Sequence, residues 1–149
     1  MAQELTETGL TAESVRGIFG LPEQDLRQYS PLTLAFIGDT VYETIVRSMV
    51  VLRGQRPAKA LHREKVRYVS APAQAQIVAR IEDKLTDEER EILRRGRSTK
   101  TGSSARNASL ADYHLATGLE ALCGYLYLKG ETARLLALLR EGFGESDEG

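Results

Sequence analysis

Two long apolar stretches, residues 31–46 and 113–128, constrain the fold of this chain more than any other feature. The only charges in the first stretch are those of Asp39 and Glu43, and the only formal charge in the second is that of Glu120. Burial of an unpaired carboxylate is costly or shifts its pKa. Neither stretch contains arginine or lysine. We therefore expect the acids of the two stretches to meet and to hold a divalent metal inside a helical core.

These acids also have simpler interpretations. Asp39 and Glu120 could be buried acids satisfied by tyrosine, serine or backbone donors, and Glu43 could be exposed or lie behind the metal ligands. Gly38 and Gly124 lie beside the acids in sequence, and glycine inside a helix costs ~1 kcal/mol relative to alanine. Close approach of a second helix or of a ligand would explain that cost, and helix packing alone is as good an explanation as a site.

Helix signals run along most of the chain, and strand signals are poor. The pattern predicts a short amphipathic turn at 10–18 and helices at about 31–53, 57–68, 70–81, 86–95, 109–130 and 131–142. Residues 96–108, rich in glycine, serine, threonine and arginine, indicate a loop. The sequence therefore predicts an all-α domain of six or seven helices.

The length of 149 residues is typical of one domain. We expect an N-terminal extension at 1–29, a catalytic domain at 30–142 and a flexible tail at 143–149. The single cysteine, Cys123, excludes an intramolecular disulfide and a cysteine-based zinc cluster. The start of the chain lacks the pattern of a signal peptide, and no apolar run is long enough to span a membrane, so we expect a cytoplasmic protein.

Positive charge is concentrated in two islands, although the net charge is only −1. Residues 53–67 contain six cations and one acid, and residues 94–106 contain five cations and no acid. Such islands favour a polyanion-binding face. For any single cation, an ordinary solvated position is the alternative.

The segment from Phe36 to Glu43 resembles the signature of the ribonuclease III family, in which Gly-Asp leads into an apolar helix. The segment from Leu119 to Leu128 resembles the second acidic helix of that family. The similarity is closer to the Mini-ribonuclease III branch, which lacks a double-stranded-RNA-binding domain, because three further segments occur in the same order. They are Arg94–Arg97, Arg106–Ala108 and Tyr125–Gly130.

This resemblance implies a homodimeric, Mg²⁺-dependent endoribonuclease on double-stranded RNA, with Mn²⁺ as a substitute metal. It implies Asp39 and Glu120 as catalytic metal ligands, with Glu43 and Thr117 orienting waters beside them. Two carboxylates usual in the wider family are absent here, where Ala35 and Thr117 stand. The branch implies a large-subunit (23S) ribosomal RNA precursor as substrate. The RNA contacts are then expected from Arg94, Arg95, Arg97, Lys100, Arg106 and Asn107.

Other functions remain compatible with the sequence. A catalytically inactive dimeric RNA-binding or ribosome-assembly module would keep the basic islands without needing Asp39 and Glu120. A helical nucleoside-triphosphate pyrophosphohydrolase would need clustered acid pairs, for which the chain offers only Glu88 and Glu91. A structural helical dimer would need neither feature. Because residues 34–46 carry apolar side chains around most of the helix, we expect that helix to contribute to a dimer interface.

Overall fold

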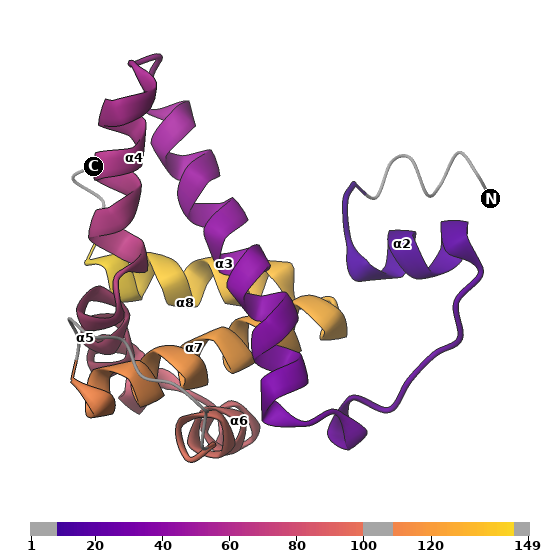
Figure 1. Ribbon diagram of the computed structural model, residues 1–149. Coiled ribbons are helices and arrows are strands. Elements are labelled where there is room, and N and C mark those ends of the chain that lie inside the picture. Colours follow the sequence, from indigo (N-terminus) through magenta and orange to yellow (C-terminus); the bar gives the residue numbers. More distant parts are fainter. Residues whose placement is uncertain (1–8, 100–108, 145–149) are drawn as a thin grey trace.

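The computed structural model describes residues 9–99 and 109–144, and all regular structure in this part is helical (Figure 1). Seven α-helices and two short 3-10 turns follow one another, which confirms the predicted all-α class. The elements are α2 (Ala12–Phe19), η1 (Leu26–Gln28), α3 (Pro31–Leu52), α4 (Ala58–Val69), α5 (Ala71–Ile81), η2 (Glu82–Lys84), α6 (Asp87–Arg97), α7 (Leu110–Lys129) and α8 (Thr132–Phe143).

Local capping signals determine where the main helices begin and end. The Ser30 hydroxyl accepts a hydrogen bond from the backbone N–H of Thr33 at the start of α3, and Ser109 caps α7 in the same way. Thr86 and Glu89 form a complete capping box at the start of α6. Gly130 ends α7 with a φ of 84°, a conformation that glycine adopts without strain. The sequence-based boundaries therefore agree closely with the structure.

Helix α7 is the centre of the domain. Residues 116–119 and 121–126 are all buried, so the helix is enclosed on nearly every side. Helices α3, α5 and α6 pack around it, and α8 lies against α5 and α7 (Figure 1). The core combines the inward side chains of these helices, among them Tyr42, Val46, Ile77, Ile81, Leu93, Leu122, Leu126 and Leu139. This enclosure is why the second apolar stretch lacks the polar face of a surface helix.

Glycines allow α3 to cross α7 at backbone contact. A Cβ atom at Gly38 would lie only 1.7 Å from the carbonyl oxygen of Glu120, and one at Gly124 would lie 2.0 Å from that of Leu34. Neither distance leaves room for a methyl group. Helix packing therefore explains both glycines. The same crossing brings Asp39, the residue after Gly38, to the side of Glu120.

Helix α6 meets α7 through a second glycine contact and extends further than the sequence indicates. A Cβ at Gly96 would lie 2.8 Å from the Cα of Gly118. Gly96 was expected to begin a loop, but it is buried within the last turn of α6, which continues through Arg97. Most of the expected loop, residues 100–108, lies outside the described part of the chain.

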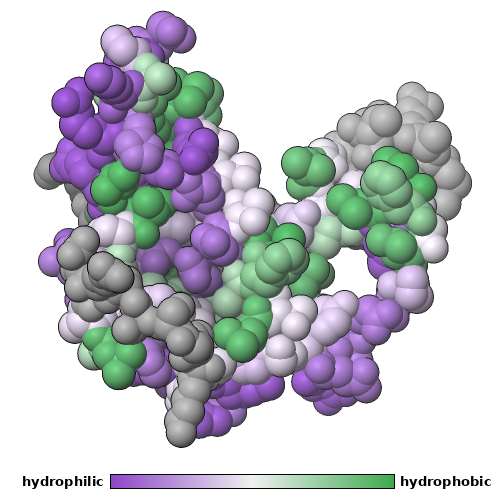
Figure 2. Space-filling model, viewed as in Figure 1, coloured by the Kyte–Doolittle hydropathy of each residue, from purple (hydrophilic) through white to green (hydrophobic). Residues whose placement is uncertain are grey.

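The N-terminal helix α2 lies apart from the other helices and is joined to them by a largely irregular segment (Figure 1). Hydrophobic patches cover α2 and part of α3 (Figure 2). On α2 and its flanks the exposed side chains are Leu10, Ile18, Phe19 and Leu21; on α3 they are Leu32, Phe36, Val51 and Leu52. Among the helices that the structure describes, none combines the length and apolar character needed to cross a membrane.

Candidate active site

Asp39 and Glu120 form a carboxylate pair where α3 crosses α7. Their side chains are in hydrogen-bonding contact, and the charge of Asp39 acts directly on Glu120. The structure thus brings together the two acids that the sequence analysis selected from segments about 80 residues apart. A third side chain, the amide of Gln74 on α5, also hydrogen-bonds to Glu120.

Glu120 has a strongly perturbed acidity. Burial raises its pKa to about 8, and the neighbouring charge of Asp39 raises it further in the same direction. The hydrogen bond from Gln74 favours the ionised form but does not outweigh these effects. Without a cation, one proton is therefore shared by the pair near neutral pH. Such a pair is an arrangement that a bound cation would stabilise.

The expectation that both acids are buried is wrong for Asp39. Its side chain is exposed, whereas Glu120 is half-buried. Gly38 and Tyr42 face the core on α3, and Asp39 lies beside that buried face at the edge of the helix contact. The pair therefore opens to the surface, where a substrate as large as a nucleic acid can reach it.

Glu43 is not the unpaired acid that its apolar neighbours suggested. Lys65 of α4 lies 2.8 Å from its carboxylate, and Arg47, one turn along α3, lies 2.9 Å away. Partial burial raises the pKa of Glu43, but the hydrogen bonds from Lys65 and Arg47 outweigh that effect and hold the pKa below its ordinary value. The carboxylate is thus already neutralised by protein cations, although its charge still reaches Glu120.

Thr117 is buried one turn before Glu120 on α7. Its hydroxyl donates a hydrogen bond of 3.1 Å to the carbonyl oxygen of Tyr113 in the same helix. Together, Asp39 and Glu120 supply two carboxylates to one place. No cluster of three or more acidic, histidine or cysteine side chains occurs within the described ranges. A cation held here would therefore take much of its coordination from water and substrate.

Comparison with known proteins identifies this arrangement. A model of the ribonuclease III domain matches residues 32–131, which include both acids of the pair. The chain belongs to the ribonuclease III family. It is 46% identical over 119 residues to a protein named Mini-ribonuclease 3 from Thermoanaerobacter sp. (strain X514), covering 80% of this chain and 84% of that protein. It is also 43% identical over 114 residues to Mini-ribonuclease 3 of Brevibacillus brevis, covering 76% and 85% of the two chains.

A crystal structure of a protein from Fusobacterium nucleatum has a similar fold. Its TM-score is 0.72 at 30% sequence identity, and the match covers 79% of this chain and 94% of that one. These comparisons confirm the resemblance seen in the sequence. The protein is an endoribonuclease of the ribonuclease III family.

The three arginines near the end of α6 are less free than the sequence suggested. Arg94 pairs with Glu91 at 2.7 Å, and Arg97 lies 3.6 Å from Glu82 of η2. The hydrogen bonds from Glu91 raise the pKa of Arg94 and lower that of Glu91. The expectation of an acid-free cationic loop is thus wrong for this part, because the acids come from the preceding turn of α6 and from η2. Three other expected RNA contacts lie outside the described residues, namely Lys100, Arg106 and Asn107.

Helix α4 presents a different basic surface on this ribonuclease III domain. Lys59, Arg63 and Arg67 follow one another at intervals of four residues, so they share one face, and all three are exposed. None of the three forms an ion pair with another residue in the part of the chain described here. The sequence analysis noted this island but did not name its residues as RNA contacts. The fourfold spacing was the signal that could have found them.

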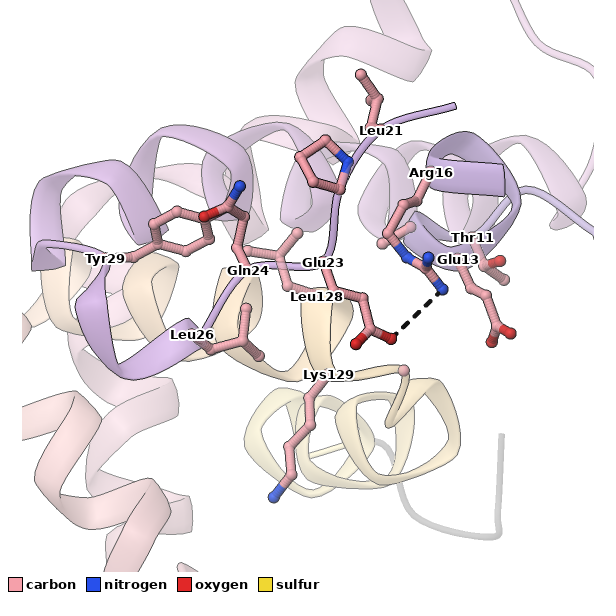
Figure 3. Close-up of a pocket in the computed structure, with 13 residues that line it drawn as sticks. Thr11, Glu13, Arg16, Leu21, Glu23, Gln24, Leu26, Tyr29, Leu128 and Lys129 are labelled. Atoms are coloured by element: carbon pink, nitrogen blue, oxygen red, sulfur yellow. Dashed lines mark ion pairs between the residues drawn. The ribbon is translucent and has the colours of Figure 1, made fainter. Parts of the chain in front are cut away.

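A separate open pocket lies between the N-terminal segment and the end of α7 (Figure 3). Its volume is about 800 Å³, and its lining includes Arg16, Glu23, Tyr29 and Lys129. Arg16 and Glu23 face each other across part of it at 3.8 Å (Figure 3). The carboxylate pair does not line this pocket. The catalytic chemistry is therefore assigned to the helix crossing and not to the largest hollow.

Proposed function

We propose that this protein is a Mg²⁺-dependent endonuclease that cuts double-stranded RNA with Asp39 and Glu120. The observation that carries the proposal is the crossing of α3 and α7, where paired glycines hold two carboxylates of different helices in contact. The ribonuclease III family membership agrees with this chemistry. The resemblance to the Mini-ribonuclease III branch supports a 23S ribosomal RNA precursor in the cytoplasm as the substrate.

The two acids suit a magnesium ion. Mg²⁺ is commonly bound in proteins through one or two carboxylates, with water and phosphate oxygens as the other ligands. The raised pKa of Glu120 indicates that the pair carries negative charge without enough compensation. When bound there, Mg²⁺ would lower the pKa of a water and neutralise charge on the scissile phosphate, and Mn²⁺ can supply the same chemistry.

The residues of the chain then have separate roles. Asp39 is exposed and can reach the substrate side of the site, whereas Glu120 is held by the core helix α7. Glu43 links α3 to α4 through Lys65, so it supports the orientation of the α3 acid from behind. Thr117 holds its hydroxyl on the helix backbone, and we assign it a packing role in this proposal.

Duplex RNA is expected to bind mainly through its phosphates. The exposed face of α4, formed by Lys59, Arg63 and Arg67, offers three unpaired cations in a row within the described structure. The arginines of α6 offer a second patch, which is partly neutralised by Glu82 and Glu91. A wide, shallow minor groove makes A-form RNA readable by shape and phosphate contacts. We therefore assign much of the binding to α4.

A homodimer fits the exposed apolar side chains of α3. Phe36 is 80% exposed and Leu32 is 47% exposed, and both lie within two turns of Asp39 on the same helix. Covering such side chains against a second copy would bury apolar surface. A two-fold axis at this place would present two carboxylate pairs to one RNA duplex, one for each strand.

Cleavage of a uniform RNA duplex during a Mg²⁺ titration tests the proposal. Asp39→Asn and Glu120→Gln should each lower the cleavage rate by about 100-fold or more, above the loss typical for an outer hydrogen-bond partner of a metal site. Asp83→Asn, an exposed acid of η2, is the matched control and should retain full activity. Wild-type activity in either site variant would overturn the assignment. Duplex binding without cleavage by the wild type would instead favour an inactive RNA-binding module.

The two basic surfaces can be separated by the salt dependence of RNA binding. Replacing Lys59, Arg63 and Arg67 with alanine should reduce the slope by up to about three phosphate contacts, at ~0.7–0.9 each. Glu91→Gln should strengthen binding if Arg94 also contacts RNA, because the substitution releases that arginine from its ion pair. An unchanged slope in the α4 variant would assign binding to other residues.

A further inference from the structure

Gln74 is a buried amide that reaches the carboxylate pair from a third helix. It lies in the first half of α5, and its side chain is only 3% exposed. Ile77, Val78 and Ile81 of the same helix are also buried, so Gln74 occupies a position on the core-facing side of α5. Helix α5 packs directly on α7. A polar side chain at such a position is costly unless it has a hydrogen-bond partner.

The partner of Gln74 is the carboxylate of Glu120. A side-chain amide carries two N–H donors, and an ionised carboxylate only accepts. The amide therefore donates to an oxygen of Glu120 when that group is ionised. In the described structure, no side-chain nitrogen or oxygen that is fully buried lacks a partner. This contact joins α5 to the α3–α7 crossing.

Gln74 differs from the other groups near Glu120. From α3, the charges of Asp39 and Glu43 both disfavour the ionised form of Glu120, and burial does the same. Tyr42 of α3 and Cys123 of α7 also lie close, and burial raises the pKa of each so far that they stay neutral. The amide is the one neighbour among the described groups whose hydrogen bond favours the carboxylate as an anion.

We propose that Gln74 is a positioning residue that fixes the Glu120 carboxylate in the orientation needed to share a divalent cation with Asp39. The inference rests on the proposed metal-dependent function of this pair. Hydrogen-bond partners of metal ligands orient the ligand, and their loss typically weakens metal binding by ~10–100-fold. A residue that only filled space in the core would have no such effect.

The test replaces the amide by a side chain of similar size without a donor, Gln74→Met. Gln76→Met is the matched control, because Gln76 lies on the same helix but is exposed. Binding of Mn²⁺ to the full chain without RNA is measured by calorimetry. We expect the dissociation constant of Gln74→Met to rise by ~10–100-fold and that of Gln76→Met to stay within twofold of wild type.

Cleavage kinetics separate positioning from a general loss of structure. In Gln74→Met, kcat at low Mg²⁺ should fall while KM for duplex RNA stays constant, and high Mg²⁺ should restore part of the rate. Gln74→Asn keeps the amide but withdraws it by one methylene, so it should lose Mn²⁺ affinity as well. This variant decides the question if the methionine variant does not fold.

Unchanged Mn²⁺ affinity in a folded Gln74 variant would overturn the inference and leave the amide with a packing role. Failure of the underlying function has a different signature. In that case the wild-type chain would bind no Mn²⁺, or Asp39→Asn would bind Mn²⁺ and cleave RNA as wild type does. The two results therefore cannot be confused.

Discussion

Glu120→Gln should stabilise the protein near neutral pH in the absence of metal, although it should abolish activity. Burial, followed by the charge of Asp39, raises the pKa of Glu120 to about 8 from an ordinary value of 4.5. The folded state therefore binds a proton at pH 7 that the unfolded state has released. At ~1.4 kcal/mol per pH unit, taking up that proton costs about 3 kcal/mol at pH 7. A neutral glutamine avoids this cost, and its amide can donate to Asp39.

The pH dependence has a definite sign. Because the folded-state pKa is raised, folding takes up a proton between about pH 4.5 and pH 8, and wild-type stability falls as the pH rises through this window. Below pH 4.5, Glu120 is protonated in both states, so the advantage of Glu120→Gln should vanish there. At pH 7 we expect a gain of about 1–3 kcal/mol, or roughly 2–4 °C in Tm for each kcal/mol.

Thermal unfolding of both proteins at pH 4.5, 7 and 8, with and without Mg²⁺, measures these quantities. Mg²⁺ at 100 times its dissociation constant should stabilise the wild type by ~2.7 kcal/mol and the variant much less. Glu43→Gln is the control of opposite sign, because Lys65 and Arg47 outweigh its partial burial and hold its pKa low. The reasoning fails if Glu120→Gln is destabilised at pH 7, or if its advantage does not change with pH.

Three further predictions concern the helices around the site. Gly38→Ala places a Cβ 1.7 Å from a carbonyl oxygen of α7, so unfolding in urea should show a loss of about 3 kcal/mol or more; a loss below 1 kcal/mol would mean that the helix crossing relaxes. Glu89→Gln should cost about 2 kcal/mol at pH 7, because it weakens a buried pair with Arg134. The hydrogen bond from Arg134 holds the pKa of Glu89 low, so this difference should disappear in acid. Phe36→Glu should give a monomer by light scattering, whereas Leu52→Glu at the other end of α3 should not; equal masses for both variants would contradict the proposed dimer surface.

The positions of the helices could be read from the sequence because their boundaries depend on neighbouring residues. Ser30, Ser109 and the capping box at Thr86 each bond to the first turn of their own helix, and Gly130 ends α7 through its own backbone conformation. These interactions involve residues only a few positions apart. The pairing of Asp39 with Glu120 was also predictable in outline, because each is an acid isolated in an apolar stretch and each stretch matched a family pattern.

The electrostatic environment of each charged group depended on contacts that local sequence does not specify. The apolar neighbours of Glu43 suggested an unpaired acid, but Lys65 reaches it from α4. The arginines of α6 were expected to be free, but Glu82 and Glu91 pair with two of them. In each case at least one deciding partner lies on another turn or another element, and only the packing of the helices brings it within range.

The sequence alone determined an all-α fold and the identities of the two acids, because capping, periodicity and isolated charge are properties of short segments. Tertiary structure decided that Asp39 is exposed while Glu120 is half-buried, although both occur in similar apolar surroundings in sequence. It also decided that Gln74 joins them, in a helix whose inward positions are otherwise apolar. Burial and hydrogen bonding depend on which helix faces cross, and the crossing of α3 and α7 at their glycines determines this.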